Sequence, residues 1–348
     1  MLQHTENIKK TLIQLGNYLS TAPENEEIQK IINQAFQKNA WFTKHYVQKA
    51  LSSIASMLNE QDISHWTKNM QPAPTPKKVG LILAGNIPMV GLHDILCVIA
   101  SGNKALIKLS SQDNILIPFI LNKITNINPQ LHPYFEFVER LKNFDAVIAT
   151  GSNNSSRYFE YYFKNVPHLI RKNRNSIAIL NGKETTADLH QLGNDIFDYF
   201  GLGCRNVAKV YVPVNYDFMP LLNQLSTFTK VAAHHKYLNN YDYNKSIYLI
   251  NNISHLDNGF LLLKKDHSLY SPLAVLYYEE YENEPTLTLQ LNSQKETIQC
   301  IASQHYQNTH FNVVNLGHTQ RPKLWDYADG VNTIDFLYSN LLPLETHL

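Results

Sequence analysis

The sequence predicts an α/β protein whose main sheet is parallel, and two features of the chain lead to this prediction. Residues 79–86, 104–111 and 144–152 are short apolar runs that end in glycine or polar residues, and segments of helical character separate them. Apolar runs without alternation are typical of strands buried on both faces. Strands that alternate with helices indicate βαβ units. Ligands on such sheets bind beyond the carboxyl ends of the strands.

The remaining elements follow in chain order. Residues 1–70 are predicted to form amphipathic helices, and the proline-rich stretch 71–78 cannot continue them. After the strand at 79–86 we expect a helix at 88–100 and further helices after the strands at 104–111 and 144–152. The second half is predicted to contain a strand at 175–180, a helix at about 186–199, and strands at 208–213, 274–281 and 311–316.

Composition excludes several classes of protein. The chain has 348 residues, with 30 Lys and Arg against 29 Asp and Glu, so it lacks the basic excess typical of nucleic-acid binding. No apolar run approaches the ~20 residues of a membrane span, and the first residues do not resemble a signal peptide. Cys97, Cys204 and Cys300 are too few and too widely spaced for a disulfide framework or a zinc site. We therefore expect a cytoplasmic protein without a metal, with Cys97 and Cys300 as core thiols and Cys300 in a helix.

One cysteine stands in an unusual context. The stretch FGLGCRNVAKVYVP, residues 200–213, places Cys204 after a Gly-x-Gly turn and before an apolar strand. The glycines allow close backbone approach and leave the sulfur uncovered, and Arg205 is expected to favour the thiolate. A single cysteine is more often a small buried hydrophobe, so the context must decide between the two interpretations.

Polar residues follow the three predicted strands of the first half. They are Asn86 after the first strand, Lys108, Ser110 and Ser111 at the end of the second, and Gly151 and Ser152 after the third. Each has an ordinary structural interpretation, because asparagine caps turns and helices and Gly-Ser commonly begins a helix. Together and at one sheet edge, they are candidates for a binding site.

Taken in order, these segments resemble the aldehyde dehydrogenase superfamily, and within it the LuxC-type long-chain acyl-CoA reductases. The resemblance covers roughly residues 79–337. Its most specific parts are the GxGCR form of the cysteine turn and the closing segment TQRPKLWDYADGVNTIDFL. It implies an aldehyde dehydrogenase-like fold, with a Rossmann-type parallel-sheet cofactor domain and an α/β catalytic domain. We expect these at 71–183 and 184–330, flanked by an N-terminal helical segment at 1–70 and a C-terminal segment at 331–348.

The resemblance also implies roles for the candidate residues. Cys204 would be the nucleophile, and the Asn86 amide and the Cys204 backbone N–H would donate to the oxyanion. Gly151 and Ser152 would hold the cofactor pyrophosphate, and Lys108 would contact the adenosine ribose. NAD-preferring relatives often carry a glutamate at the position of Ser111. Its absence leaves Lys108, Ser110 and Ser111 able to accept a 2′-phosphate, so the prediction is NADPH rather than NADH.

Two departures from the superfamily pattern bear on the reaction. Arg171 stands where the resemblance places the catalytic glutamate, and Ser268 stands where a glutamate would hold the nicotinamide ribose. Oxidation of an aldehyde to an acid needs an activated water, and a general base typically contributes ~10²–10⁴-fold to such a step. Reduction of a thioester needs no water. The missing glutamate therefore favours reduction.

Other polar residues allow two interpretations each. His93 is either a proton relay near the presumed site or a packed helix residue. The run of Arg171, Lys172 and Arg174 is either a solvated face or a group that binds the CoA phosphates or keeps the cysteine ionised. Adjacent histidines at 234 and 235 point in different directions on a helix, which predicts a surface pair.

The function predicted is NADPH-dependent reduction of a long-chain acyl-CoA, or another acyl thioester, to the aldehyde through a Cys204 acyl-enzyme. One alternative is a reductase of short-chain acyl-CoA or acyl phosphate. Another is a non-enzymatic subunit of the same fold that holds an acyl group or serves as a scaffold. The expected substrate is acyl-CoA or an acyl carrier. The resemblance leaves open an acyl-donating partner protein and a homo-oligomer.

Overall fold

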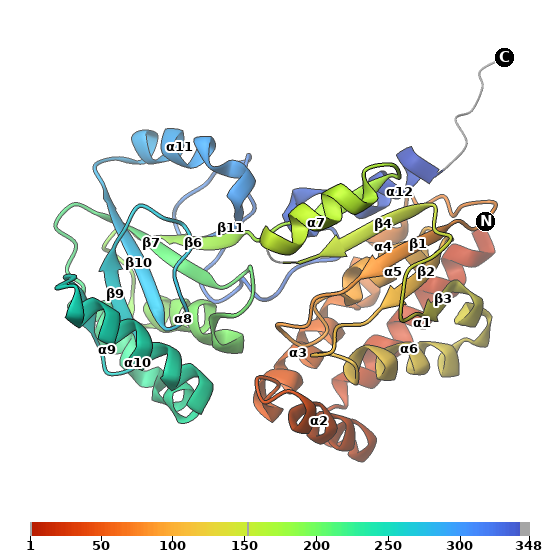
Figure 1. Cartoon of the computed structure of the whole chain (residues 1–348), viewed down its shortest axis with the longest axis horizontal. Coiled ribbons are helices and arrows are strands. Elements are labelled where there is room, and N and C mark those ends of the chain that lie inside the picture. The colour runs from red at the N-terminus through yellow and green to blue at the C-terminus, as the bar shows by residue number, and fades with distance from the viewer. Residues whose placement is uncertain (1, 152, 342–348) are drawn as a thin grey trace. The chain divides into compact units, whose positions relative to one another are not determined.

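A computed structural model describes residues 2–151 and 153–341, and its chain forms two compact units (Figure 1). The first unit runs to Asn173 and takes up the chain again from Pro322, and the second is Arg174–Arg321. These limits differ from the predicted ranges. The N-terminal helices and the C-terminal part belong to the same unit as the first sheet, and the strand at 175–179 pairs within the second sheet. The functions assigned to the two ranges stay predictions.

The first unit contains a five-stranded, fully parallel sheet with strand order β3-β2-β1-β4-β5. Its strands are β1 (Lys78–Ile82), β2 (Lys104–Lys108), β3 (Phe135–Phe137), β4 (Ala146–Thr150) and β5 (His168–Arg171). Ile82, the last residue of β1, is in register with Lys108 of β2 and Ala149 of β4. The three central strands therefore end at the same level, which places the loops that follow them at one edge.

Helices cover this sheet and form the N-terminal region. They are α1 (Leu2–Ser20), α2 (Glu26–Lys38), α3 (Lys44–Met57), α4 (Glu60–Thr67), α5 (Leu92–Ala100), α6 (Leu116–Ile127), α7 (Asn153–Phe163) and α12 (Thr333–Leu341). In the sheet, the crossovers from β1 to β2 and from β2 to β3 move toward one edge, and the crossover from β4 to β5 moves toward the opposite edge. Right-handed crossovers then put α6 and α7 on opposite faces, as Figure 1 shows. Among the described residues, no helix is both long enough and apolar enough to cross a membrane.

The second unit contains a seven-stranded sheet with strand order β12-β11-β6-β7-β10-β9-β8. Its strands are β6 (Asn175–Ile179), β7 (Val207–Pro213), β8 (Leu256–Asp257), β9 (Leu262–Lys265), β10 (Val275–Tyr281), β11 (Ile298–Ala302) and β12 (Val313–Val314). All neighbouring strands are parallel except β8 and β9. The helices of this unit are α8 (Thr186–Phe197), α9 (Met219–Leu225), α10 (His235–Ile250) and α11 (Glu284–Ser293).

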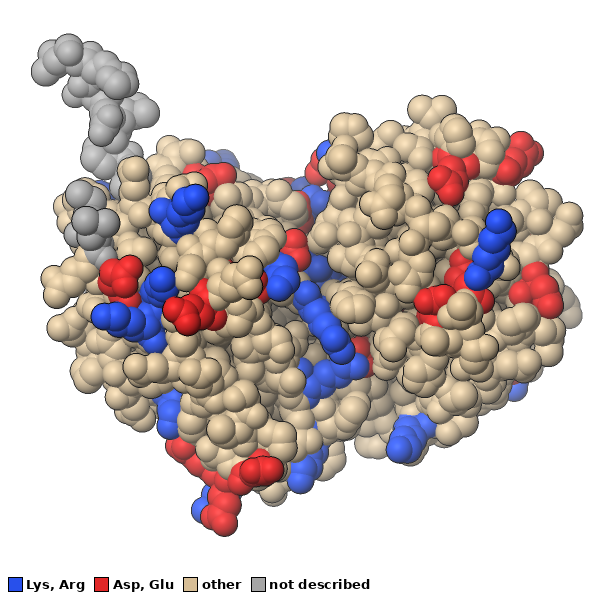
Figure 2. Space-filling view, turned by 180° about the vertical axis from the view of Figure 1, so that it is seen from behind, with Lys and Arg blue, Asp and Glu red and all other residues tan. Residues whose placement is uncertain are grey.

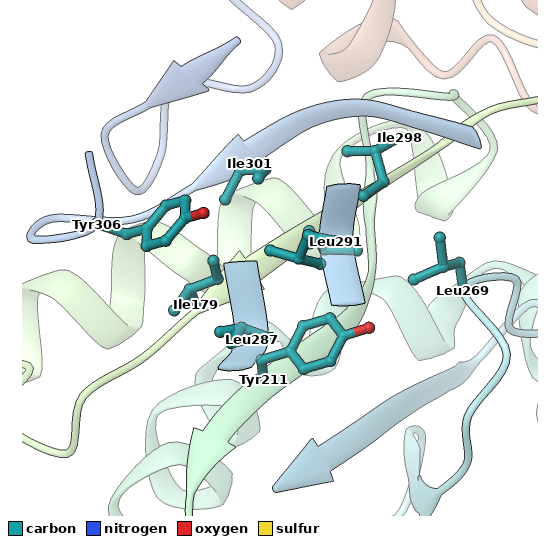
Figure 3. Close-up of a cluster of buried hydrophobic side chains, with 9 residues drawn as sticks. Ile179, Tyr211, Leu269, Leu287, Leu291, Ile298, Ile301 and Tyr306 are labelled. Carbon is teal, nitrogen blue, oxygen red and sulfur yellow. The ribbon is translucent and has the colours of Figure 1, made fainter. Parts of the chain in front are cut away.

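A buried apolar cluster fixes α11 against this second sheet (Figure 3). Strands β6, β7 and β11, helix α11 and two loops contribute its members, which are Ile177, Ile179, Tyr211, Leu269, Leu287, Leu291, Ile298, Ile301 and Tyr306. Fully burying one such aliphatic side chain contributes about 1.5–3 kcal/mol. The cluster makes β6 and β7 rigid supports for the loops at their ends.

Several predicted elements differ from the structure in their limits. Helix α5 begins at Leu92 rather than at residue 88, because Met89 has a left-handed φ of 57° that a helix cannot contain. Helix α8 ends at Phe197, because Tyr199 and Phe200 are also left-handed. The prediction that Cys300 lies in a helix is wrong. It lies in β11, where all five residues are buried, and a fully buried run gives no period that separates strand from helix.

Candidate active site

The first unit brings five of the predicted site positions to one edge of its sheet. Asn86 lies in the loop after β1, and Lys108, Ser110 and Ser111 lie at and just beyond the end of β2. Gly151 follows β4 directly and precedes α7. Asn86, Lys108 and Ser111 are exposed and Ser110 is half-buried. Ser152 lies outside the described residues. The grouping agrees with a ligand site at this edge, while the roles of the residues stay predictions.

The Asn86 loop packs directly against the loop that carries Ser110. A Cβ atom added to Gly85 would lie 2.6 Å from Ser110 Oγ and 3.1 Å from the backbone N of Asp113. Gly85 is therefore required by the close approach of the two loops. The buried Asp113 carboxylate joins them, because it accepts hydrogen bonds from Met89 N at 2.7 Å and from Leu116 N at 3.3 Å. One side chain thus fixes both the Asn86 loop and the start of α6.

Burial raises the pKa of the Asp113 carboxyl to about 6, although its hydrogen bonds with backbone N–H groups oppose the shift. The folded protein therefore binds this proton more tightly than the unfolded chain, whose aspartate pKa is about 3.9. The stability contributed by Asp113 is full below about pH 4 and is lost as the pH rises through 6.

We therefore expect the stability of Asp113→Asn relative to the wild type to rise by about 2 kcal/mol between pH 4 and pH 7, because asparagine does not titrate. Urea unfolding at four pH values measures this difference. Asp188→Asn is the control of opposite sign, because bonds from Thr185 lower the pKa of Asp188. If the difference in free energy of unfolding between the wild type and Asp113→Asn does not change with pH, the raised pKa of Asp113 is contradicted.

The cysteine turn in the second unit is built from an unusual backbone. Tyr199, Phe200 and Gly201 have φ values of 51°, 60° and 78°, so three consecutive residues are left-handed and only one of them is glycine. Tyr199 and Phe200 are both buried. A non-glycine residue held in a sparsely populated region costs of order 1–3 kcal/mol, and such residues cluster at functional sites. The half-buried Cys204 lies three residues after Gly201.

Hydrogen bonds hold the turn on both sides of Cys204. The Asn206 side chain accepts from Gly203 N at 2.9 Å, and its amide donates to Asp195 O at 3.1 Å and Asp198 O at 2.8 Å. These carbonyls belong to the end of α8 and the residue after it, so Asn206 satisfies acceptors that the helix leaves unpaired. On the other side, Ser176 Oγ donates to Cys204 O at 3.0 Å.

A buried ion pair supports the loop that contains Ser268. Lys209 of β7 is fully buried, and its Nζ donates to a Glu279 carboxylate oxygen and to His267 O at 3.0 Å. Glu279 also accepts from Gln290 Nε2 at 3.0 Å. Burial alone would raise the pKa of Glu279, but its bonds with Lys209 and Gln290 hold it below its usual range. Lys209 thus connects the strand that follows Cys204 to the loop at 266–272 by a charged contact.

The structure corrects one interpretation of the basic run, because Arg171 is 3% exposed and does not lie on a solvated face. Its guanidinium donates to Asp94 Oδ1 at 2.7 Å, to Thr333 Oγ1 at 2.8 Å and to Ala328 O. Although burial opposes it, the nearby Arg171 charge holds the pKa of Asp94 below its usual range. Arg171 therefore fastens the C-terminal part of the chain to α5 and β5.

His93 belongs to the same packed region of the first unit. Its Nε2 lies 2.8 Å from Leu324 O, and its ring packs against Trp66 and Tyr327 with centroid distances of 6.2 and 5.4 Å. Trp66 Nε1 in turn donates to Tyr327 OH at 3.1 Å. These contacts favour the interpretation of His93 as a packed helix residue.

Sequence reasoning missed Ser176, Asn206, Asp113 and Lys209. Asn206 stands two residues after Cys204 and Asp113 two residues after Ser111, and a short polar side chain near a turn or a helix start is a usable signal. Nothing in the sequence marks Ser176 or Lys209, because their partners are distant in the chain. No group of three or more His, Cys, Asp or Glu side chains in the described part of the chain could hold a metal ion.

Solved structures with the same fold are aldehyde dehydrogenase-like enzymes. Aldehyde dehydrogenase 21 from Physcomitrella patens aligns with a TM-score of 0.68 and 10% identity, covering 97% of this chain and 85% of that one. An oxidoreductase from Marinobacter aquaeolei gives 0.66 and 11%, covering 92% and 79%. An NADP dependent enzyme from E. coli gives 0.61 and 12%, covering 89% and 78%. These identities show the fold alone, and they confirm the predicted aldehyde dehydrogenase-like α/β class.

The sequence itself identifies the family. Residues 3–219, more than half of the chain and including Cys204, match the family described as Acyl-CoA reductase (LuxC). The chain belongs to this family, so it is an oxidoreductase of acyl groups. The match ends before the closing segment at 319–337, whose resemblance stays a prediction. No curated protein matches the chain.

Proposed function

We propose that the chain reduces a long-chain acyl-CoA to the aldehyde with NADPH, through an acyl-enzyme on Cys204. The observation that carries the proposal is the cysteine turn. Three left-handed residues precede Cys204 and hydrogen bonds hold the backbone on both sides of it, within a family of acyl-CoA reductases. A cysteine that served only as a core residue, as the buried Cys97 does, would not need this backbone.

The first unit fits a dinucleotide at the carboxyl edge of its parallel sheet. A Cβ atom at Gly151 would lie 2.8 Å from Ser155 Cβ, so glycine lets β4 pass closely into α7, whose N-terminal N–H groups favour an anion. Lys108, Ser110 and Ser111 would hold the adenosine end. No carboxylate stands at position 111 to repel a 2′-phosphate, which supports NADPH. On the face that Figure 2 shows, charges of both signs are interspersed on each unit.

The chain's own residues perform the acyl transfer. The Cys204 thiolate attacks the thioester carbonyl, a new C–S bond forms, and the bond to CoA breaks so that CoA leaves as its thiolate. The Cys204 N–H and the Asn86 amide are the proposed donors to the oxyanion. Bound NADPH would supply the hydride that reduces the acyl carbon. The resulting oxyanion re-forms the carbonyl as the bond from the acyl carbon to the Cys204 sulfur breaks, which releases the aldehyde and returns the Cys204 thiolate.

If the Asn86 amide donates to the oxyanion, Asn86→Ala should slow acylation by about 100-fold or more. Cofactor affinity and thermal stability should change little, because Asn86 is exposed in the loop between β1 and α5. Stopped-flow acylation and thermal melting measure the two effects, and the exposed Asn114 on the neighbouring loop gives a matched alanine control. Lower stability with normal turnover per folded molecule would show that Asn86 only caps a turn.

The proposal is tested by following NADPH oxidation with short and long acyl-CoAs, an acyl phosphate and NADH as the alternative cofactor. We expect oxidation with long acyl-CoA and one aldehyde formed for each NADPH consumed. Turnover with only short acyl-CoA or acyl phosphate would overturn the substrate assignment. An adduct that forms without NADPH oxidation would favour an acyl-holding subunit.

A further inference from the structure

We propose that Ser176 is a positioning residue that sets the orientation of the Cys204 backbone for acyl transfer. The inference rests on the proposed function of Cys204 and deepens it. Ser176 is fully buried in β6, lies 28 positions before Cys204 in the chain, and bonds its carbonyl. All residues involved belong to the second unit.

The orientation of Cys204 is determined by the two peptide planes that flank it. In the first plane, Gly203 O accepts from Asn206 N at 3.0 Å, and the peptide bond to Cys204 is trans. Because a trans peptide is planar, the Cys204 N–H must point away from Asn206. In the second plane, Cys204 O accepts from Ser176 Oγ. With both planes held, the backbone dihedrals of Cys204 are fixed, and so are the directions of its N–H and its Cα–Cβ bond.

A bulge between β6 and β7 lies at Ser176, beside its hydrogen bond to the Cys204 carbonyl. Ser176 pairs with Val207 of β7, but the next residue, Ile177, pairs with Lys209. Strand β7 therefore contains one extra residue, Ala208, at this point. Such bulges re-aim side chains and occur often beside active sites.

A second thiol completes the arrangement. Cys300 Sγ lies 3.1 Å from Ser176 Oγ, and burial raises the pKa of Cys300 to about 11, so it remains a thiol. The Ser176 hydroxyl has one proton, which it donates to Cys204 O, so Cys300 S–H is the donor to Ser176 Oγ. The chain of hydrogen bonds runs from Cys300 through Ser176 to the Cys204 carbonyl.

Two reagents separate positioning of the oxyanion donor from general structural support. Iodoacetamide alkylates a thiolate without forming an oxyanion, whereas p-nitrophenyl acetate acylates it through a tetrahedral oxyanion. Cys97 and Cys300 are at most 1% exposed, so both reagents report on Cys204. Losing an oxyanion donor slows the reaction by about 10²–10³-fold. Misorienting the Cys204 N–H without losing it should therefore slow acylation by less, about 10-fold or more.

We expect Ser176→Ala to slow acylation by p-nitrophenyl acetate about 10-fold or more, while the rate of alkylation by iodoacetamide changes less than about twofold. Ser176→Thr keeps the hydroxyl, so we expect it to restore the rate of acylation. Ser303→Ala is the matched control, because Ser303 is also buried in this sheet and donates to a carbonyl, Ile179 O at 2.8 Å. It should leave both rates unchanged. Cys300→Ala should have little effect, because the bond from Ser176 to Cys204 remains.

Each outcome decides the proposal. Equal slowing of both reactions by Ser176→Ala would show a merely structural role, and unchanged acylation would show that the contact has no effect on the donor. Either result would overturn the inference. It would also be overturned if p-nitrophenyl acetate did not acylate Cys204 in the wild-type protein. If the ester acylates Cys204 but acyl-CoA does not, the proposed substrate fails while the inference on Ser176 stands.

Discussion

Cys204→Ala is expected to abolish both covalent acylation and aldehyde formation, because it removes the only thiol of the described chain that is more than marginally exposed. In a serine protease, loss of the triad nucleophile costs about 10⁶-fold in turnover, which sets the scale of the expected effect. Intact-mass measurement after mixing with an acyl-CoA detects the adduct, and an aldehyde assay measures turnover. The variant should remain folded, because Cys204 is not part of the apolar core.

The other two cysteines serve as controls within the same chain. Burial raises the pKa of Cys97 well above its usual value and that of Cys300 to about 11, so both remain protonated. Cys97→Ala and Cys300→Ala should therefore acylate at nearly the wild-type rate. Acylation that persists in Cys204→Ala would place the nucleophile elsewhere and overturn the mechanism.

The second large effect is expected from Arg171, and it is an effect on stability. Arg171→Met leaves the Asp94 carboxylate buried without its counter-ion, which typically costs 3–5 kcal/mol. Combining it with Asp94→Asn should recover most of this loss, because replacing both members of a buried pair is often neutral. Thermal and urea unfolding of the single and double variants measure the coupling between the two residues.

Lys172→Met is the matched control for Arg171. Lys172 is exposed and pairs with Glu160 at 2.7 Å, and such surface pairs contribute about 0–1 kcal/mol. Its loss should hardly change stability. If Arg171→Met were equally harmless, the buried pair would not hold the C-terminal part of the chain. Arg171→Glu puts a carboxylate where the resemblance places the catalytic glutamate. It also brings two carboxylates together in the interior and is expected to unfold the first unit.

The alternation of strands and helices was predictable because the central strands are buried on both faces. The run at 79–86 shows this, although β1 itself ends at Ile82, where the chain turns to bring Gly85 against Ser110. Strand β5 was missed. Three of its four residues are only half-buried and its last residue, Arg171, begins a basic run, so neither composition nor periodicity marks it.

The candidate site was predictable where a local motif carries the chemistry. Cys204 is marked by its glycines, and Asn86 by its place after an apolar run. The support of the site was not predictable, since Ser176 contacts Cys204 only after β6 and β7 have paired. Tyr199 and Phe200 carry no sequence signal of their left-handed backbone, which tertiary contacts impose. Neither interpretation of the basic run foresaw the burial of Arg171, because its partners Asp94 and Thr333 are far away in the chain.

The central claim is that the Cys204 acyl-enzyme is discharged by hydride and not by water. By the sequence resemblance, Arg171 takes the place of the superfamily's glutamate, and a guanidinium bound to Asp94 has no acceptor lone pair with which to activate water. The direct test mixes the wild-type protein with a labelled long-chain acyl-CoA in the absence of NADPH, follows the adduct by intact mass, and then adds NADPH.

We predict one acyl group for each chain, located on the Cys204 peptide. It should persist without cofactor and be released as aldehyde when NADPH is added, with little free fatty acid. Rapid release of free fatty acid before NADPH is added would contradict the account, because it would require a base for water at this site.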